Sequence, residues 1–529
     1  MTQTQTRSRP RRPKPTLRVS CLGEPDLLFG EGQRENDPKY GITNYGPHSI
    51  NDLGRHRNSI RVGIIGSGET VAMTNQWLSR CQHEIEPICA RSKQSLGFPG
   101  FNPDSPFRSQ FVVDPSCVKR LGELEINAIC DTIDRRKGFE LGLDLVAKEV
   151  RIIAENYAPD VIIVALPQNL YEACRSVGGR KDRMEMTPAE RKLQRLARRQ
   201  QKSRQEILFD KYDVDSDQPL AYRSFRRALK ARVMKWSVPI QIMLPRAFFD
   251  ESSLVSFDDK LAAIKRQGVQ EPATRAWNFC TAMYYKANGI PWRLASVPRG
   301  TCFVGVSFYR QDTVKLPHMH SSLAQLFTDG GDALVLRGES FEWQVETQGS
   351  PHISREHAHR LVERVVRTYE EHVRRKPERL VVHKTSRFTE DERLGFTDGV
   401  NGAGIHQRDF VALTQRDIRA FRRGEYPPVR GTLIEFPRAG ALLYAMGYIP
   451  SLDTYPRGHV PRPLEIIERW TDSDLSTVCR EILGLTKLNW NTADHAGSFP
   501  ITLRFARRVG EVLSEVTDDE PHPHYRFYV

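Results

Sequence analysis

Short apolar runs alternate with amphipathic stretches through the first half of the chain. The runs at Arg61–Ile65, Val161–Pro167 and Pro239–Pro245 carry few polar residues, which is typical of strands buried on both faces of a parallel sheet. From about Phe139 to Tyr157, apolar side chains recur at helical spacing. Strands of this kind alternating with helices predict an α/β fold.

A second α/β pattern begins near residue 300. Its predicted elements are, in order, a strand at Thr301–Tyr309, a hairpin formed by Ala333–Leu336 and Phe341–Val345, a helix at Ser354–Lys376, strands at Leu380–His383, Gly431–Phe436 and Ala441–Met446, and a helix from about Pro500 to Val516. A chain of 529 residues is long enough for two domains. We expect the first at 61–295 and the second at 296–529.

Two basic segments fall outside these patterns. Residues 1–19 hold several Arg and Lys among prolines and are predicted to be a flexible arm, followed by an irregular segment at 20–60 that is rich in Gly, Pro and Asn. An insertion at about 178–218 contains ten Lys or Arg and three acids between Arg180 and Arg204. Within it, Thr187–Glu190 forms a capping box that predicts a helix start. A solvated charged face and contact with nucleic acid both remain open for this insertion.

Composition narrows the class of protein. Hydrophobic residues make up 39% of the chain, and the net charge is +13 with a pI near 9.3, so a folded protein with a polyanionic partner is favoured. No apolar run approaches the roughly 18 residues of a membrane helix. The basic N-terminus lacks the apolar core of a secretory signal, and none of the nine cysteines forms a C-x-x-C pair. These features favour a cytoplasmic location.

A glycine-rich turn raises the alternative of a dinucleotide-dependent oxidoreductase. Gly63–Gly68 follows a strand and precedes a helix, but Val71 stands where a third glycine belongs, and Ala90–Lys93 stands where an acidic residue should end the second strand. A tight strand-to-helix turn explains these glycines without a ligand. Two H-x-H pairs, at His318 and at His357, lack a third metal ligand at suitable spacing and are interpreted as surface histidines.

The most informative group of residues is basic. Arg226 and Lys230 are four apart on a probable helix and share a face, Gln241 lies on the next strand, and Lys286 follows later. A guanidinium, an ammonium and an amide that converge beside a helix end suit a terminal phosphate. The spacing alone is a weak signal, because R-x-x-x-K is common on helices.

The ordered set of motifs resembles the Argonaute family, and specifically the short prokaryotic Argonautes. Residues 230–241 are similar to the guide-binding helix, turn and strand of that family, and 277–292 to the junction between its MID and PIWI domains. Residues 485–502 are similar to the PIWI C-terminal signature, and 29–47 to the N-terminal stretch of the short family. The resemblance implies a Rossmann-like MID domain followed by a ribonuclease H-like PIWI domain.

This resemblance implies a pocket for the 5′-phosphate of a guide strand. Its four binding positions correspond to Arg226, Lys230, Gln241 and Lys286, and Lys265 is a rival for the fourth position. The first position is often Tyr or His in the family, so Arg226 departs from the common pattern but keeps a phosphate donor. The resemblance also implies that Mg²⁺ helps to hold the phosphate, with Gln241 and the carboxylate of Val529 as ligands.

In the PIWI region, the resemblance places catalytic aspartates at two positions that hold hydroxyl side chains. These positions are Ser307, after Cys302–Val306, and Thr385, after His383. Two-metal cleavage needs bridging carboxylates, which a hydroxyl cannot replace. We therefore expect guided cleavage to be lost. An active guided nuclease with a rearranged acidic cluster is the alternative, although the nearby acids Asp312, Glu390 and Asp398 are interpreted as surface or turn residues.

The implied function is that of a guide-loaded subunit in prokaryotic defence. The guide would be RNA, the target single-stranded DNA from plasmids or phages, and base pairing would supply the specificity. Short Argonautes act with a separate protein whose APAZ region stands in for their missing domains and which carries an effector: a TIR or sirtuin-like NADase, or a nuclease. We expect Leu22–Leu53 to contact such a partner, with the basic insertion as a second candidate.

Overall fold

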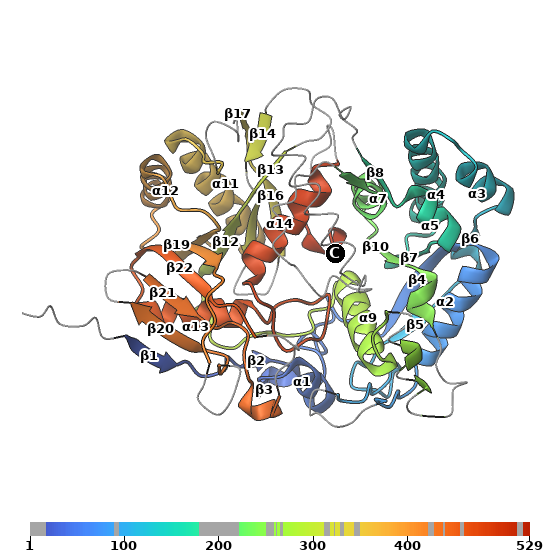
Figure 1. Cartoon of the computed structure of the whole chain (residues 1–529), viewed down its shortest axis with the longest axis horizontal. Coiled ribbons are helices and arrows are strands. Elements are labelled where there is room, and N and C mark those ends of the chain that lie inside the picture. The colour runs from blue at the N-terminus through green and yellow to red at the C-terminus, as the bar shows by residue number, and fades with distance from the viewer. Residues whose placement is uncertain are drawn as a thin grey trace, which may run out of the picture.

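The computed structural model describes residues 17–88, 95–178, 222–249, 256, 259–260, 262–264, 268–310, 318–321, 323–327, 333–342, 350–421, 428–436, 440–454, 460–515 and 522–529. Their elements form two α/β halves that lie side by side, one around a five-stranded sheet and one around a nine-stranded sheet (Figure 1). The predicted α/β class is confirmed. Lys265, most of the basic insertion and Asp312 lie outside the described residues.

The five-stranded sheet is entirely parallel. Its strand order is β10 (Ile240–Met243), β7 (Val161–Ala165), β4 (Ser59–Gly66) and β5 (Gln110–Val112), and β6 (Val118–Arg120) pairs with the far end of β4. Every residue of β7 is buried, because alternate side chains enter two cores on opposite faces. One core holds α4 (Arg135–Tyr157) and α7 (Phe225–Val233), and the other holds α2 (Gly68–Cys81) and α9 (Pro272–Lys286). The short helices α3 (Glu123–Cys130) and α5 (Gln168–Cys174) pack beside α4.

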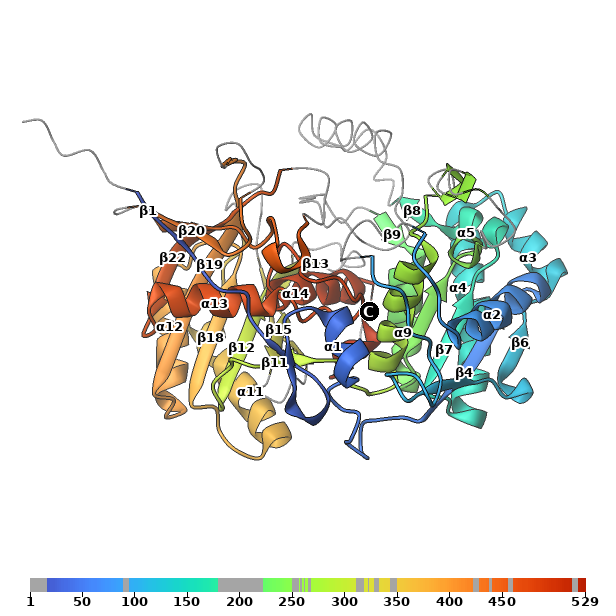
Figure 2. The ribbon, with the colours of Figure 1, turned by 90° about the horizontal axis from the view of Figure 1, so that it is seen from below.

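The nine-stranded sheet mixes parallel and antiparallel pairs. Its order is β1 (Arg18–Cys21), β20 (Thr432–Phe436), β21 (Gly440–Leu443), β22 (Leu464–Thr471), β19 (Gln407–Gln415), β18 (Arg379–Lys384), β12 (Thr301–Val306), β15 (Leu323–Phe327) and β16 (Ala333–Arg337). Helices α11 (Arg355–Val373) and α12 (Glu390–Gly402) cover one face of the central strands. Helices α13 (Leu475–Leu485) and α14 (Ile501–Leu513) lie on the other face (Figure 2).

Two sequence-based predictions in this half are wrong. The strand expected at Thr301–Tyr309 breaks at Ser307, so that β12 joins the nine-stranded sheet while β13 (Phe308–Arg310) joins a separate three-stranded sheet. The expected hairpin does not form, because β16 pairs with β15 whereas β17 (Ser340–Glu342) pairs with β14 (His318–Ser321). In both cases, pairing with strands from elsewhere in the chain decides the outcome, and closeness in sequence does not.

The N-terminal segment pairs with strands from the rest of the chain. Strand β1 begins at Arg18, inside the stretch predicted to be a flexible arm, and pairs antiparallel with β20. Strands β2 (Leu27–Leu28) and β3 (Arg34–Glu35) form a small sheet with β11 (Arg293–Leu294), beside α1 (Pro38–Tyr45). The side chains of Leu27, Phe29 and Ile42 are fully buried. Only the outward face of this segment therefore remains for the partner contact predicted for it.

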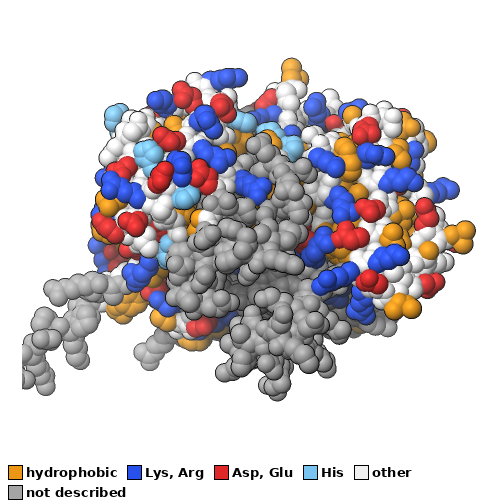
Figure 3. All heavy atoms as spheres, turned by 90° about the horizontal axis from the view of Figure 1, so that it is seen from above, with side chains coloured by type: hydrophobic (Ala, Val, Ile, Leu, Met, Phe, Trp, Pro, Cys, Tyr) orange, Lys and Arg blue, Asp and Glu red, His pale blue; other side chains and the backbone are white. Residues whose placement is uncertain are grey.

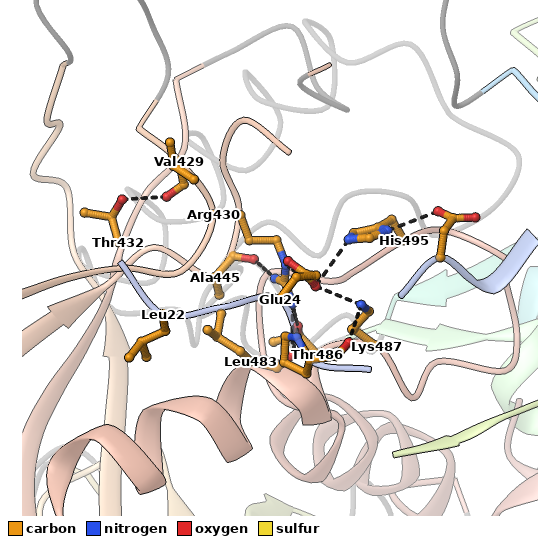
Figure 4. Close-up of polar contacts among 12 residues, drawn as sticks. Leu22, Glu24, Val429, Arg430, Thr432, Ala445, Leu483, Thr486, Lys487 and His495 are labelled. Carbon is orange, nitrogen blue, oxygen red and sulfur yellow. Dashed lines mark hydrogen bonds and ion pairs between the residues drawn. The ribbon is translucent and has the colours of Figure 1, made fainter. Parts of the chain in front are cut away.

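A buried cluster of charges fixes this segment to the nine-stranded half (Figure 4). Glu24 pairs with Arg430 at 2.9 Å, with Lys487 at 2.8 Å and with His495 at 3.2 Å, and His495 also lies 3.0 Å from Asp37. Burial acts to raise the pKa of Glu24, but the surrounding cations outweigh burial and hold that pKa well below its usual range. We call these five residues the Glu24 cluster.

None of the helices in the described part of the chain is both long and apolar enough to cross a bilayer.

Candidate functional site

The two lysines expected to bind phosphate meet at the same short stretch of main chain. Lys230, on α7, donates a hydrogen bond of 3.3 Å to the carbonyl of Tyr528, and Lys286, the last residue of α9, donates to the carbonyl of Val529. Both acceptors follow the 3₁₀ helix η6 (Tyr525–Phe527). Residues more than 240 positions apart thus meet where the phosphate pocket is expected, and Lys286 and Val529 are almost completely buried there.

Further cations gather at the same end of the sheet. Arg226 lies in the first turn of α7, and its Nε is buried without a hydrogen-bond partner among the described residues. Burial lowers the pKa of Arg246, on the 3₁₀ helix η4 (Pro245–Phe248), and repulsion from Arg226 and Arg175 lowers it further. Gln241, on β10, donates a hydrogen bond of 3.3 Å to the carbonyl of Ile242. Clustered cations of this kind favour an anionic ligand.

Lys286 is the most strongly perturbed of these cations. Burial lowers its pKa to about 7, and the nearby Arg508 contributes in the same direction. The Val529 oxygen that accepts from this ammonium therefore offsets its burial only in part. A phosphate placed here would add negative charge and would raise the pKa of Lys286 again.

Glu515 ties the pocket helix α7 to the nine-stranded half. Its carboxylate accepts hydrogen bonds from the backbone N–H of Ser224 at 3.0 Å and from Arg223 at 2.9 Å, and it lies 3.6 Å from Arg227. The Glu515 side chain is almost fully buried, so this interaction fixes the start of α7 against the end of α14. Sequence reasoning missed Glu515, because nothing in the local pattern links position 515 with position 224.

A second set of contacts joins the halves next to Lys286. The Trp292 indole donates to the carbonyl of Lys487 at 2.9 Å, and the Trp490 indole donates to the carbonyl of Trp292 at 3.0 Å. Tyr285 packs on Trp490 with ring centroids 4.9 Å apart. The predicted junction motif thus connects the pocket to the Glu24 cluster through Lys487.

The two positions expected to have lost catalytic aspartates lie next to each other. Strands β12 and β18 run parallel with Val306 opposite Lys384, so Ser307 and Thr385 follow directly at neighbouring strand ends. By the alternation of a strand, both residues share a face with Gly305, where a Cβ would lie 2.1 Å from the carbonyl oxygen of Thr502 on α14. Ser307 Oγ is buried and has no hydrogen-bond partner in the part of the chain that is described.

On the α14 face, the histidine two positions before Thr385 is neutral. His383 lies 2.9 Å from the Thr502 hydroxyl, and burial lowers its pKa to about 3, so the imidazole is neutral. Lys384 points to the opposite face, where it pairs with Glu392 and lies 2.9 Å from His352. Across the residues that the structure describes, no group of three or more His, Cys, Asp or Glu is placed to hold a metal ion.

Two of the nearby acids belong to the surface of α12. Glu390 forms an exposed ion pair with Arg393, and Asp398 lies 2.6 Å from Arg355. They were interpreted as surface or turn residues, and the structure places them on an exposed helical face.

Packing explains the glycine-rich turn. A Cβ on Gly66 would lie 2.4 Å from the Thr70 hydroxyl and 2.7 Å from the carbonyl of Ala165, because that hydroxyl donates to that carbonyl at 2.8 Å. Ser67 caps α2 through the backbone N–H of Thr70. The turn therefore needs glycine for close packing, as the sequence indicated.

One face of the molecule carries charged side chains of both signs (Figure 3). On the face shown in Figure 3, Lys and Arg side chains stand on both sides of the central grey atoms.

No family model matches the chain, and no curated protein matches it in sequence. Solved structures do match. Clostridium butyricum Argonaute bound to a guide DNA and a 19-mer target DNA is 12% identical with a TM-score of 0.58, and the match covers 94% of this chain and 53% of that one. Aa-Ago with externally bound siRNA is 13% identical with a TM-score of 0.53, covering 96% and 56%. A. aeolicus Argonaute is 14% identical with a TM-score of 0.50, covering 95% and 54%.

At these identities the likeness concerns the fold. The chain has an Argonaute-like fold, with a MID-like half around the five-stranded sheet and a ribonuclease H-like PIWI half around the nine-stranded sheet. It spans about half the length of the Argonaute chains that it matches.

Proposed function

We propose that this chain is the guide-binding subunit of a short prokaryotic Argonaute system. It holds the 5′-phosphate of a guide RNA in the MID-like half and presents the guide for pairing with single-stranded target DNA. The convergence of Lys230 and Lys286 on the main chain of Tyr528 and Val529 carries this proposal, because it brings cationic side chains from two distant helices to the C-terminal segment.

The chemistry of the pocket suits a terminal phosphate. Charge-assisted hydrogen bonds from ammonium or guanidinium groups to phosphate are the strong ones, and Lys230, Lys286 and Arg226 offer such donors. The matched structures, one bound to guide DNA and target DNA and one to siRNA, are consistent with this use of the fold. RNA as guide and DNA as target follow from the family resemblance.

Guided cleavage is not part of the proposed function. The neighbouring hydroxyls of Ser307 and Thr385 stand at the strand ends, beside a neutral His383, where two divalent metals would need bridging carboxylates. The defence outcome is assigned to an APAZ-containing effector protein that target recognition activates, in the cytoplasm of the host. Activation requires the active assembly to bind the guide–target duplex more tightly than the inactive one.

We further propose that Mg²⁺ assists at the phosphate. The candidate protein ligands, the Gln241 amide and the oxygens of Val529, are few, and cations surround them. This donor set suits a hard cation only together with the phosphate oxygens, which would supply most of the negative charge. The residues present fit magnesium only as a ternary site with the guide.

The test compares guides that differ only at the 5′ end. Replacing Lys230 and Gln241 together by Ala should weaken binding of a 5′-phosphorylated RNA far more than binding of the 5′-hydroxyl RNA. Each lost charge-assisted bond corresponds to about 1.5–3 kcal/mol. Lys235→Ala is the matched control, since this exposed lysine lies after α7 and packs over Trp236, outside the pocket. Equal losses for both guides would place the pocket elsewhere.

A further inference from the structure

The nine-stranded sheet has one covered edge and one open edge. At the β16 edge, the backbone N–H of Val335 donates to the carbonyl of Pro523 at 2.8 Å, and Leu334 forms a bridge with His524. At the other edge, β1 pairs with β20 on one side and with no described strand on the other. Figure 1 shows β1 at the outer margin of the sheet, far from the MID-like half.

The backbone of β1 presents hydrogen-bonding groups to this open edge. Leu22 N–H donates to the carbonyl of Gly431, which makes this a hydrogen-bonded pair of the β1–β20 ladder. The carbonyl of Thr432, opposite Cys21, instead accepts from Tyr444 on its other side. Since pairs alternate along an antiparallel ladder, the N–H and C=O groups of Val19 and Cys21 point away from β20. A strand added here would find two donors and two acceptors.

Apolar side chains flank these open groups. Leu17 is 52% exposed and Val19 is 62% exposed, and both lie on the same face of the strand as the exposed Cys21. Sheet proteins commonly protect an edge with inward-pointing charges, proline or a bulge. Strand β1 is short and carries Arg18, which limits pairing at this edge, but its outward-facing residues Val19 and Cys21 are neither charged nor proline, so another strand can pair with them.

Charge and backbone chemistry select the occupant. The first 18 residues contain six Arg or Lys and no acid, which favours an acidic ligand. A nucleic acid could accept from the two N–H groups but offers no regular ladder to the carbonyls, whereas an extended polypeptide satisfies both. A second copy of this chain would bring a second arm of the same charge.

We propose that β1 is a docking strand, to which an extended acidic segment of a second protein adds as a tenth strand of the PIWI sheet. This inference rests on the proposed function only in that the second protein is the expected effector partner. Glu24, three residues after β1, pairs with Lys487, whose carbonyl accepts from Trp292 at the junction with the MID-like half. Strand β1 is thereby connected to the junction with the MID-like half through the segment that the Glu24 cluster fixes.

The experiment uses the full chain and a fluorescent peptide of alternating Glu and Val as the probe. Fluorescence polarisation should show binding that weakens with salt, and a Lys–Val peptide should bind about tenfold more weakly or not at all. Val19→Pro removes one outward N–H and no hydrogen bond to β20, and should weaken binding of the Glu–Val peptide by about five- to tenfold. A peptide N-methylated on its pairing edge should lose binding to a similar extent.

Guide binding separates this inference from the proposed function. Val19→Pro should leave affinity for a 5′-phosphorylated guide unchanged. If that variant fails to fold, Val19→Glu keeps the backbone donor and should reduce binding of the Glu–Val peptide by charge repulsion. If the wild type binds the peptide but no guide, the proposed function is wrong and the docking-strand inference still stands.

Three outcomes would overturn the docking strand. One is the absence of binding by the acidic peptide, or equal binding of the acidic and basic peptides. Another is a homodimer in the wild type that Val19→Pro dissociates, which would make the occupant a second copy. The third is loss of 5′-hydroxyl oligonucleotide binding in Val19→Pro, which would make it a nucleic acid.

Discussion

The MID-like pocket and the PIWI strand ends are built from the same kind of element but carry opposite chemistry. In the pocket, Lys230 of α7 and Lys286 of α9 donate to the main chain of Tyr528 and Val529, and burial lowers the pKa of Lys286 to about 7. At the ends of β12 and β18, the corresponding side chains are the hydroxyls of Ser307 and Thr385, beside a neutral imidazole. The pocket is proposed to bind a phosphate dianion. At the strand ends, the described residues form no acidic cluster that could hold divalent metals.

Under the proposed function, this difference makes binding and cleavage separable properties of one fold. Burying the Lys286 ammonium costs free energy, which a bound phosphate would recover. The buried Ser307 hydroxyl, which has no hydrogen-bond partner among the described residues, costs less free energy than a buried charge. The proposed function, binding a guide without cutting a target, predicts a difference of this kind between the two regions.

The largest effect should come from Lys286. Lys286→Met keeps the length of the side chain and removes the charge, so affinity for a 5′-phosphorylated guide should fall by about 10- to 100-fold. Affinity for the 5′-hydroxyl guide should change little. Filter binding with both guides measures this, with Lys235→Met as the control. A loss of equal size for both guides would show that Lys286 acts on the fold rather than on the phosphate.

The pH dependence of binding should follow from the same residue. The pKa of Lys286 is about 7 in the free chain, and a phosphate dianion would raise it, so the complex takes up a proton above pH 7. Affinity for the phosphorylated guide should therefore fall as pH rises above 7, by up to about tenfold per pH unit, until the pKa of the complex is reached. Binding titrations from pH 6.5 to 9 test this.

Two controls sharpen the pH experiment. The 5′-hydroxyl guide carries no terminal dianion, so its affinity should stay nearly flat over the same range. Lys286→Met should also abolish the slope for the phosphorylated guide. A slope that survives in Lys286→Met would assign the proton to another group.

Removal of magnesium should have a smaller effect than loss of Lys286. Chelation by EDTA should weaken binding of the phosphorylated guide and leave binding of the hydroxyl guide unchanged, because the proposed cation is held mainly by phosphate oxygens. Isothermal titration calorimetry with and without Mg²⁺ measures the difference. Identical affinities in both buffers would contradict a metal in the pocket and would leave phosphate binding to the lysines alone.

The smallest expected effect is none at all. Ser307→Asp restores one carboxylate, but Thr385 leaves the neighbouring strand end without another, so a two-metal centre should not form. Labelled complementary DNA incubated with the guide-loaded variant should stay intact with Mg²⁺ or Mn²⁺. Any guide-dependent product from the wild-type chain would favour the alternative interpretation, an active guided nuclease.

Elements with a one-dimensional signature were predictable from the sequence. Strands β4, β7 and β10 appear as apolar runs because both of their faces are buried, and α4 shows its apolar stripe because one face is exposed. Helix α9 was not predicted as an element, since every residue of it except Thr274 is buried and no polar face marks its period. The Argonaute-like fold itself is confirmed by the matched structures.

The candidate site was predictable as residue types but not as a geometry. Spacing alone placed Arg226 and Lys230 on one helix, while the role of Lys286 came from a family resemblance. That Lys230 and Lys286 contact adjacent residues of the C-terminal segment depends on tertiary packing, as does the anchoring of α7 by Glu515. The expected hairpin at residues 333–345 failed for the same reason, because neighbours in sequence pair with strands from elsewhere.

The distance along the chain between Lys286 and Val529 also sets an order of events during biosynthesis. The two residues are separated by 243 positions, so a ribosome that adds about 5–20 residues per second needs roughly 10–50 s to make the acceptor after it has made the donor. The delay between synthesis of β1 and synthesis of its partner β20 is even longer, since the two strands are more than 400 residues apart. Throughout that time the nascent MID-like half lacks one wall of its pocket. Loading of a guide would therefore follow translation of residue 529, and a prematurely truncated chain would be unable to capture a guide.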